Sequence, residues 1–300
     1  MTRPIIRVID VEAGPAPIMD GDRVVEPGVI EIGYQDIVSQ RDDLLGNPID
    51  WELRGTGSAL VNPGRPIPPE TSAIHNLIDS DIADAPAWGF VASRYFSDEM
   101  MEGVIAFAAH SIKTEQSLIS ADLTRGLPWI CSYKNAIRLW PDMASHSNGS
   151  VRYHLNPAGL DRDRAFPTHR ALPDAYVTAH ILLEALNLAS WADLAEWSTR
   201  PVLLPRCKIG KDYNNGGKGT PWPEVTTGML EWILPRDFDE DVKHTVRHHL
   251  QQREIDQRLE YERRDLSRQF QENGIAPEVP NIIEEAAAPA RDTNTMELDL

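Results

Sequence analysis

The sequence predicts an α/β fold in which a mixed sheet is flanked by helices, followed by a small C-terminal module and a disordered acidic tail. Apolar segments typical of strands are concentrated before residue 61. Strand-like and helix-like segments then alternate between residues 99 and 197, a pattern typical of layered α/β proteins. After residue 197 the composition changes, first to Gly, Pro and Lys and finally to acids, Pro and Ala.

The N-terminal part predicts an antiparallel meander of three strands. Segment 5–12 (IIRVIDVE) is apolar and β-branched and ends in two acids, which indicates a buried strand. Residues 13–28 are rich in Gly, Pro and Asp and indicate a loop or hairpin turn. Segments 29–38 (VIEIGYQDIV) and 51–61 predict the second and third strands.

The middle of the chain predicts the remaining strands and most helices. Segment 63–77 is a proline-rich loop that enters a helix. Segment 104–110 (VIAFAAH) indicates a buried strand, with a helix over 113–120, and segment 128–142 repeats this order. Residues 172–197, with regularly spaced Leu and Ala, predict the clearest amphipathic helix.

These patterns divide the chain into four predicted parts. The main α/β domain covers 1–197, a basic Gly/Lys-rich module covers 198–236, and a charged helix covers 237–271. The tail, 272–300, is rich in Pro, Ala and acids without periodicity and is expected to be disordered.

Composition limits the possible functions. The two cysteines in 300 residues argue against a disulfide framework and favour a reducing cytoplasm. No apolar run is long enough to cross a bilayer, and the first residues do not resemble a secretory signal. The net charge of −17 counts against nucleic-acid binding through charge alone, although residues 200–223 are locally basic.

Two acids stand at the end of the first predicted strand. Asp10 and Glu12 are two residues apart, and side chains at such positions point to the same face of a strand. Acids on an otherwise apolar strand are costly unless they are paired or metal-bound. Exposure at a fraying strand end is the simpler explanation for this short motif taken alone.

A histidine and an acid stand at the start of the long predicted helix. His169 precedes Asp174 by five residues. Asp174 alone is explained by the helix dipole, and His169 alone by an ordinary loop position. A histidine beside metal-binding acids can also accept a proton from water.

The order of these motifs, with 109–115 (AHSIKTE) between them, resembles that of the DEDDh 3′–5′ exonucleases. These enzymes have the ribonuclease H-like fold. Blocks 29–37, 65–84, 129–142 and 169–186 are most similar to the exodeoxyribonuclease X group, and the resemblance extends from Ile5 to Leu234.

The resemblance implies roles for individual residues. Asp10, Glu12, Glu115 and Asp174 would hold two Mg²⁺ or Mn²⁺ ions, with Asp10 shared between them, and His169 would be the general base. Carboxylates are the oxygen ligands that such cations take, and two ions suit phosphodiester hydrolysis. The resemblance also places Ile74 and His75 at the pocket for the terminal nucleotide, although core packing explains both residues equally well.

Two features depart from the family pattern. Glu115 replaces the usual Asp, and Ser111 and Thr114 replace the usual Asn and aromatic residue before it. The Gly- and Pro-containing insert 13–28 directly follows the metal acids. The insert is positioned to affect which 3′ ends the enzyme admits.

Other motifs carry less information. Segment 210–219 lacks the spacing of a Walker A loop. Lys208, Lys211 and Lys218 are candidates for contacts with backbone phosphates, but a basic turn that keeps the module soluble is an equal alternative. His244 and His248 form an i, i+4 pair without a third ligand, and Trp222 is a candidate for base stacking.

The main functional hypothesis is a metal-dependent 3′–5′ exonuclease that acts on single-stranded or frayed DNA ends and releases nucleoside 5′-monophosphates. Its partner is therefore a nucleic acid with a free 3′ end, with no membrane involved. One alternative is an RNA-trimming enzyme of the same fold. The other is an inactive exonuclease-like domain that binds nucleic acid or a protein partner.

Overall fold

The computed structural model describes residues 2–21, 23–210 and 217–272. The chain divides into two compact units, Met1–Val246 and Arg247–Leu300. The sequence-based prediction of a disordered tail falls on residues 273–300, outside the described residues. No helix in the described part of the chain is both long enough and apolar enough to span a membrane.

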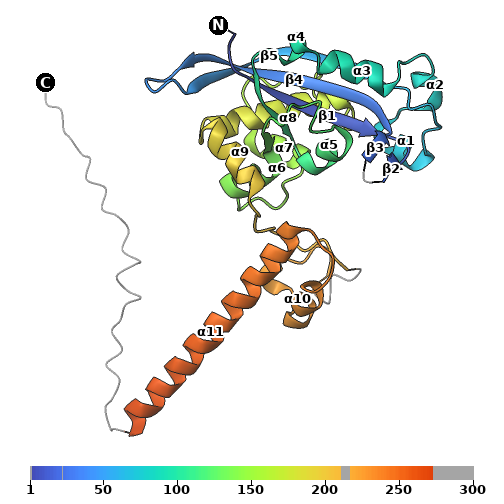
Figure 1. Cartoon of the computed structure of the whole chain (residues 1–300). Helices are drawn as coiled ribbons and strands as arrows, with labels where there is room; N and C mark the ends of the chain where they lie inside the picture. Colours follow the sequence, from blue (N-terminus) through green and yellow to red (C-terminus); the bar gives the residue numbers. More distant parts are fainter. Residues whose placement is uncertain (1, 22, 211–216, 273–300) are drawn as a thin grey trace, which may run out of the picture. The chain divides into compact units, whose positions relative to one another are not determined.

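A five-stranded mixed sheet forms the centre of the first unit, in the order β5-β4-β1-β6-β7 (Figure 1). Strands β1 (Ile5–Ala13), β4 (Val29–Asp42) and β5 (Pro48–Leu60) form the expected antiparallel meander. Strands β6 (Val104–Ala109) and β7 (Trp129–Cys131) then add in parallel to β1. The prediction of a mixed α/β sheet is confirmed.

Strand β1 is central because its apolar residues are buried on both faces. Ile6 and Val8 pack in one core cluster with residues of α8 (Ala171–Leu186) and α9 (Trp191–Thr199). Ile9 and Val11 pack in another cluster with residues of α3 (Trp88–Tyr95) and α5 (Ile112–Leu118). Burial on both faces explains the nearly continuous apolar run of this strand.

The remaining helices fill out the two layers. On the side of α3, the chain forms α1 (Pro69–His75), α2 (Asp79–Ile82) and α4 (Asp98–Met101). Between β7 and α8 it forms α6 (Ser132–Leu139) and α7 (Asn148–Leu155), and α8 contacts both of these helices as well as β1, β4 and β5. The insert 13–28 contains a two-stranded hairpin, β2 (Ile18–Asp20) and β3 (Arg23–Glu26).

The prediction of one amphipathic helix over 172–197 is wrong. Helix α8 ends at Leu186, and α9 begins at Trp191. The side chain of Ser190, just before α9, accepts a hydrogen bond from the backbone N–H of Asp193. Serine at this position caps a new helix start. Helix α8 is also buried on two sides, against the sheet and against α6 and α7, so its apolar residues do not form one stripe.

The region after α9 contains a 3₁₀ turn (Trp222–Glu224), α10 (Thr227–Ile233) and α11 (Glu240–Glu272). The indole of Trp222 is fully buried, so it cannot stack on a base as the sequence suggested. His244 and His248 lie on α11, and neither belongs to the group of potential metal ligands found among the described residues. Cys131 and Cys207 are free and buried.

Candidate metal centre and active site

Three of the four predicted metal acids come together in the structure. Asp10 and Glu12 extend the face of β1 that carries Ile6 and Val8 toward α8, and Asp174 lies in the first turn of α8. One carboxylate oxygen from each of the three residues lies within 4.8 Å of the others. The fold therefore gathers acids that are far apart in sequence into one cluster.

A close approach of two backbones positions Asp174 in this cluster. Gly33 pairs with Asp10 across the β1–β4 ladder. A Cβ atom at Gly33 would lie 2.4 Å from the backbone nitrogen of Leu172, which is shorter than any tolerated contact. Glycine at this position therefore lets the start of α8 lie directly on β4, beside Asp10.

An ion pair that the sequence reasoning missed fixes the same helix start. Glu31 on β4 faces Glu12 in the strand register and is buried. Its carboxylate accepts hydrogen bonds from Nε and Nη2 of Arg170 at 2.7 and 2.8 Å and from the N–H of Ala171 at 3.1 Å. An acid in the apolar strand segment VIEI was the available signal, since buried charges need partners.

His169 lies on the exposed side of the acid cluster. Its backbone has a φ of 59°, a left-handed conformation that few residues other than glycine adopt. Its backbone N–H donates to Oδ2 of Asp174 at 3.0 Å, while the imidazole is exposed. Unfavourable backbone conformations persist where surrounding contacts fix them, here the hydrogen bond to Asp174 and the neighbouring Arg170–Glu31 pair.

Glu115 lies close to the cluster but outside the group of three acids. Its side chain, from α5, is 5% exposed, and its Oε2 atom has no hydrogen-bond partner. Its charge acts on Asp10, where it is the strongest electrostatic contribution among the neighbouring acids. The longer side chain of Glu115 thus still brings its charge to the acid cluster.

Burial and mutual repulsion raise the pKa values of the acids in this cluster. Burial, followed by repulsion from Glu115, Asp174 and Glu12, raises the pKa of Asp10 well above its ordinary value. Burial and the nearby acids raise the pKa of Glu12 to about 8, although Arg170 partly opposes this shift. Burial also raises the pKa of Glu115 to about 7. Acids with pKa values raised in this way are typical of functional sites.

These donors fit a hard divalent cation. Carboxylate oxygens are the ligands preferred by Mg²⁺, Mn²⁺ and Ca²⁺, and the cluster offers one from each of Asp10, Glu12 and Asp174. The unpartnered Oε2 of Glu115 is a further oxygen donor nearby. A bound cation would offset the repulsion that, after burial, raises the pKa values of Asp10 and Glu12.

The two residues proposed for the terminal nucleotide have different environments. Ile74 on α1 is 53% exposed, whereas His75 is buried. The Nδ1 atom of His75 accepts a hydrogen bond from the N–H of Leu77 at 3.0 Å, and burial lowers the pKa of its imidazole. The structure therefore leaves the Ile74 side chain, rather than that of His75, free to contact a ligand.

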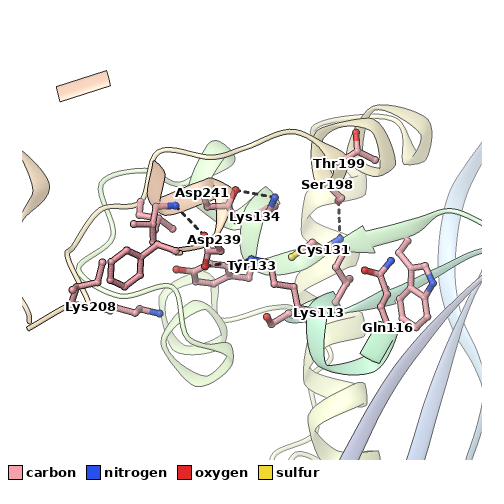
Figure 2. A pocket seen from close by; sticks show the side chains of 17 residues that line it. Lys113, Gln116, Cys131, Tyr133, Lys134, Ser198, Thr199, Lys208, Asp239 and Asp241 are labelled. Carbon is pink, nitrogen blue, oxygen red and sulfur yellow. Dashed lines mark hydrogen bonds and ion pairs between the residues drawn. The ribbon is translucent and has the colours of Figure 1, made fainter. Parts of the chain in front are cut away.

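The basic candidates lie in the segment after α9. Lys208 and Lys218 are exposed, and Lys211 lies outside the described residues. The ammonium of Lys208 lies 5.3 Å from the centre of the Tyr133 ring. Figure 2 shows Lys208 at a cavity where Lys113 pairs with Asp239 at 3.4 Å and Lys134 pairs with Asp241 at 3.0 Å.

The chain is similar to known nucleases. No family model matches the chain. Exodeoxyribonuclease 10 of Escherichia coli strain K12 is 27% identical over 253 residues, which cover 82% of this chain and 99% of that protein. A solved structure of exonuclease X in complex with 5′ overhanging duplex DNA has 27% identity and a TM-score of 0.48, covering 64% of this chain and 99% of that one. The nuclease domain of 3′hExo, a DEDDh family member bound to rAMP, has 15% identity and a TM-score of 0.45, covering 62% and 94%.

The chain is therefore similar in sequence to exodeoxyribonuclease 10 along nearly the whole length of that protein.

Proposed function

We propose that this protein is a metal-dependent 3′–5′ exonuclease that acts on single-stranded or frayed 3′ ends of DNA and releases nucleoside 5′-monophosphates. The observation that carries the proposal is the convergence of Asp10, Glu12 and Asp174, whose carboxylate oxygens lie within 4.8 Å of one another. The similarity to exodeoxyribonuclease 10 supports DNA as the substrate.

Each residue has a distinct proposed role. Asp10, Glu12 and Asp174 would hold one Mg²⁺ or Mn²⁺ ion, and Asp10 and Glu115 would hold a second. When bound, these ions would neutralise charge on the scissile phosphate and favour deprotonation of the attacking water. Because its imidazole is exposed beside Asp174, His169 can accept the proton of that water as the general base.

The remaining candidates would bind the substrate. Ile74 offers an exposed apolar side chain for the terminal nucleotide. The buried His75 would hold the segment that carries Ile74 in place. Lys208, Lys211 and Lys218 would contact backbone phosphates, which contribute affinity independent of sequence.

The direct test uses the full chain and a labelled 3′-ended oligonucleotide with Mg²⁺ or Mn²⁺. The Asp10→Asn substitution preserves the size of the side chain but removes its charge, and we expect shortening to slow by at least about 10³-fold. Unchanged shortening by Asp10→Asn would contradict the proposal, provided that circular dichroism shows the same fold.

Matched DNA and RNA oligonucleotides in this assay distinguish the preferred sugar. Faster shortening of RNA would replace the DNA substrate with an RNA one while keeping the mechanism. If the wild-type protein shortens neither strand and metal has no effect on it, the domain is an inactive binding module.

A further inference from the structure

A second cavity lies between the α/β core and the basic segment that follows α9. It has a volume of about 530 Å³. Its core wall contains His110, Ser145 and Ser147, and its other wall contains Arg206, Lys208 and Lys218. This cavity shares Lys208 with the one in Figure 2, so the two adjoin.

The lining of this cavity is suited to an anion. Among the described residues, no carboxylate lines it, and none forms an ion pair with Arg206, Lys208 or Lys218. Arg206 donates through Nη1 to the carbonyl of Gly219 at 2.8 Å, which holds its guanidinium against the wall that also carries Lys218. Arg206, Lys208 and Lys218 therefore place three positive charges, with no acidic partner among the described residues, around one cavity.

The opposite wall adds hydroxyl groups and a helix start. The Ser147 hydroxyl lies 2.7 Å from that of Ser150, which lies 3.0 Å from that of Ser145. Ser147 also caps α7, an eight-residue helix. Hydroxyls and a helix N-terminus are groups that proteins commonly use to contact phosphates.

This wall is connected to the elements that carry the metal acids. Ser111, which lines the cavity, immediately precedes α5, the helix that carries Glu115. Asn148 follows Ser147 and donates through Nδ2 to the backbone carbonyl of Asp174 at 3.3 Å. A chain bound in the cavity therefore lies next to elements that hold two of the proposed catalytic acids.

From this arrangement we propose that the cavity is the path of a single DNA strand on the 5′ side of the scissile bond. The phosphates of that strand contact Arg206, Lys208 and Lys218, while Ser145 and Ser147 contact it from the core wall. The inference rests on the proposed exonuclease function and deepens it. A positively charged groove that follows the backbone is typical of single-strand binding.

The proposal predicts that affinity depends on strand length. A dinucleotide reaches the metal acids without filling the cavity, whereas a 20-mer occupies both. The triple substitution Arg206→Gln, Lys208→Gln and Lys218→Gln should raise the KM for a 20-mer about 10- to 100-fold. The KM for the dinucleotide should rise less than about threefold.

A matched control removes three cations from the far end of the sheet. Arg3, Arg41 and Arg54 are exposed and pair with acids near the β4–β5 hairpin, and their replacement by Gln should leave both KM values unchanged. The 20-mer should also respond less to salt in the triple variant, with the slope of log affinity against log salt smaller by about 2. A Ser145→Glu substitution should weaken 20-mer binding through charge repulsion.

Equal KM changes for the two lengths, or an unchanged salt slope, would overturn the proposed path. Fluorescence anisotropy of a labelled 20-mer, measured with the same variants in the absence of metal, keeps this test separate from catalysis. If the wild-type protein cleaves nothing but the triple variant loses binding, the exonuclease proposal fails, and the cavity remains a single-strand binding site without a scissile bond. If cleavage occurs but binding is unaffected in the triple variant, only the strand path fails.

Discussion

The two ends of the β1–β4 pair treat buried charge in opposite ways. At one end, Arg7 faces Asp36 in the strand register, and its guanidinium donates to both carboxylate oxygens at 2.8 Å. The same guanidinium donates to the carbonyl of Met100 and lies over the Tyr34 ring. At the other end, Glu12 faces Glu31. Two acids therefore lie opposite each other at this end, whereas an arginine and an acid lie opposite each other at the first end.

The difference separates acids that have an arginine partner from acids that do not. Asp36 and Glu31 each have an arginine in bidentate contact, which satisfies both carboxylate oxygens. Asp10, Glu12 and Glu115 have no such partner among the described residues, and the pKa values of all three are raised. Buried acids of this kind either bind protons, as their raised pKa values indicate, or are compensated by a bound cation, and the proposed metal ions would supply that cation.

The largest effects on the free energy of unfolding should come from replacing the arginine at each end of the β1–β4 pair. Arg7→Met leaves Asp36 buried without a cation and should lower the free energy of unfolding by about 3–5 kcal/mol. Arg170→Met should cost less, about 1–3 kcal/mol, because Arg170 is 30% exposed. Urea denaturation of both variants measures these changes.

The two substitutions should affect kcat in the reverse order, with the larger loss for Arg170→Met. Arg170→Met loosens the segment that carries His169 and should lower kcat about 10- to 100-fold, as loss of supporting contacts in metal sites does. Arg7→Met should leave kcat within about threefold at a temperature where it remains folded. Equal kcat losses in both variants would remove the functional distinction between the two ends.

Metal binding and pH should change the free energy of unfolding through the acids at the Glu12 end of the β1–β4 pair. Because the folded-state pKa of Glu12 is raised from 4.5 to about 8, the folded state binds more protons than the unfolded state between these values. The metal-free protein should therefore lose stability as the pH rises from 4.5 to 8. Thermal unfolding across this pH range measures the loss.

Saturating Mg²⁺ or Mn²⁺ should reverse this pH dependence. At a metal concentration of 100 times Kd, binding should add about 2.7 kcal/mol to the free energy of unfolding. The Asp10→Asn variant provides the comparison, since it should gain much less. If the stability of the metal-free protein does not change between pH 4.5 and 8, the raised pKa of Glu12 is contradicted.

The smallest expected effect concerns the length of one side chain. Glu115→Asp keeps the charge, so activity should stay within about tenfold of wild type, at a stability cost of about 1 kcal/mol for the lost methylene. Glu115→Gln should lower activity far more, because it removes the charge. Equal kcat values for Glu115→Gln and wild type, measured on the same oligonucleotide, would exclude Glu115 from the site.

Much of the fold could be predicted because local apolar patterns in the sequence indicate its strands. The apolar segments before residue 61 became three antiparallel strands, and the segment around Phe107 became a buried parallel strand. The boundary between α8 and α9 was missed because Leu and Ala continue through residues 187–190. Only the serine cap and the packing of α8 on two sides reveal that two helices are present.

The sequence by itself determined which acids were candidates, because their spacing on a strand and at a helix start does not depend on the rest of the fold. It did not determine the Glu31–Arg170 pair or the contact of Gly33 with α8. Each of these joins residues that are distant in the chain, and only tertiary packing decides which distant residues become neighbours. Side-chain charge is fixed by residue type, but whether a charge is compensated depends on those neighbours.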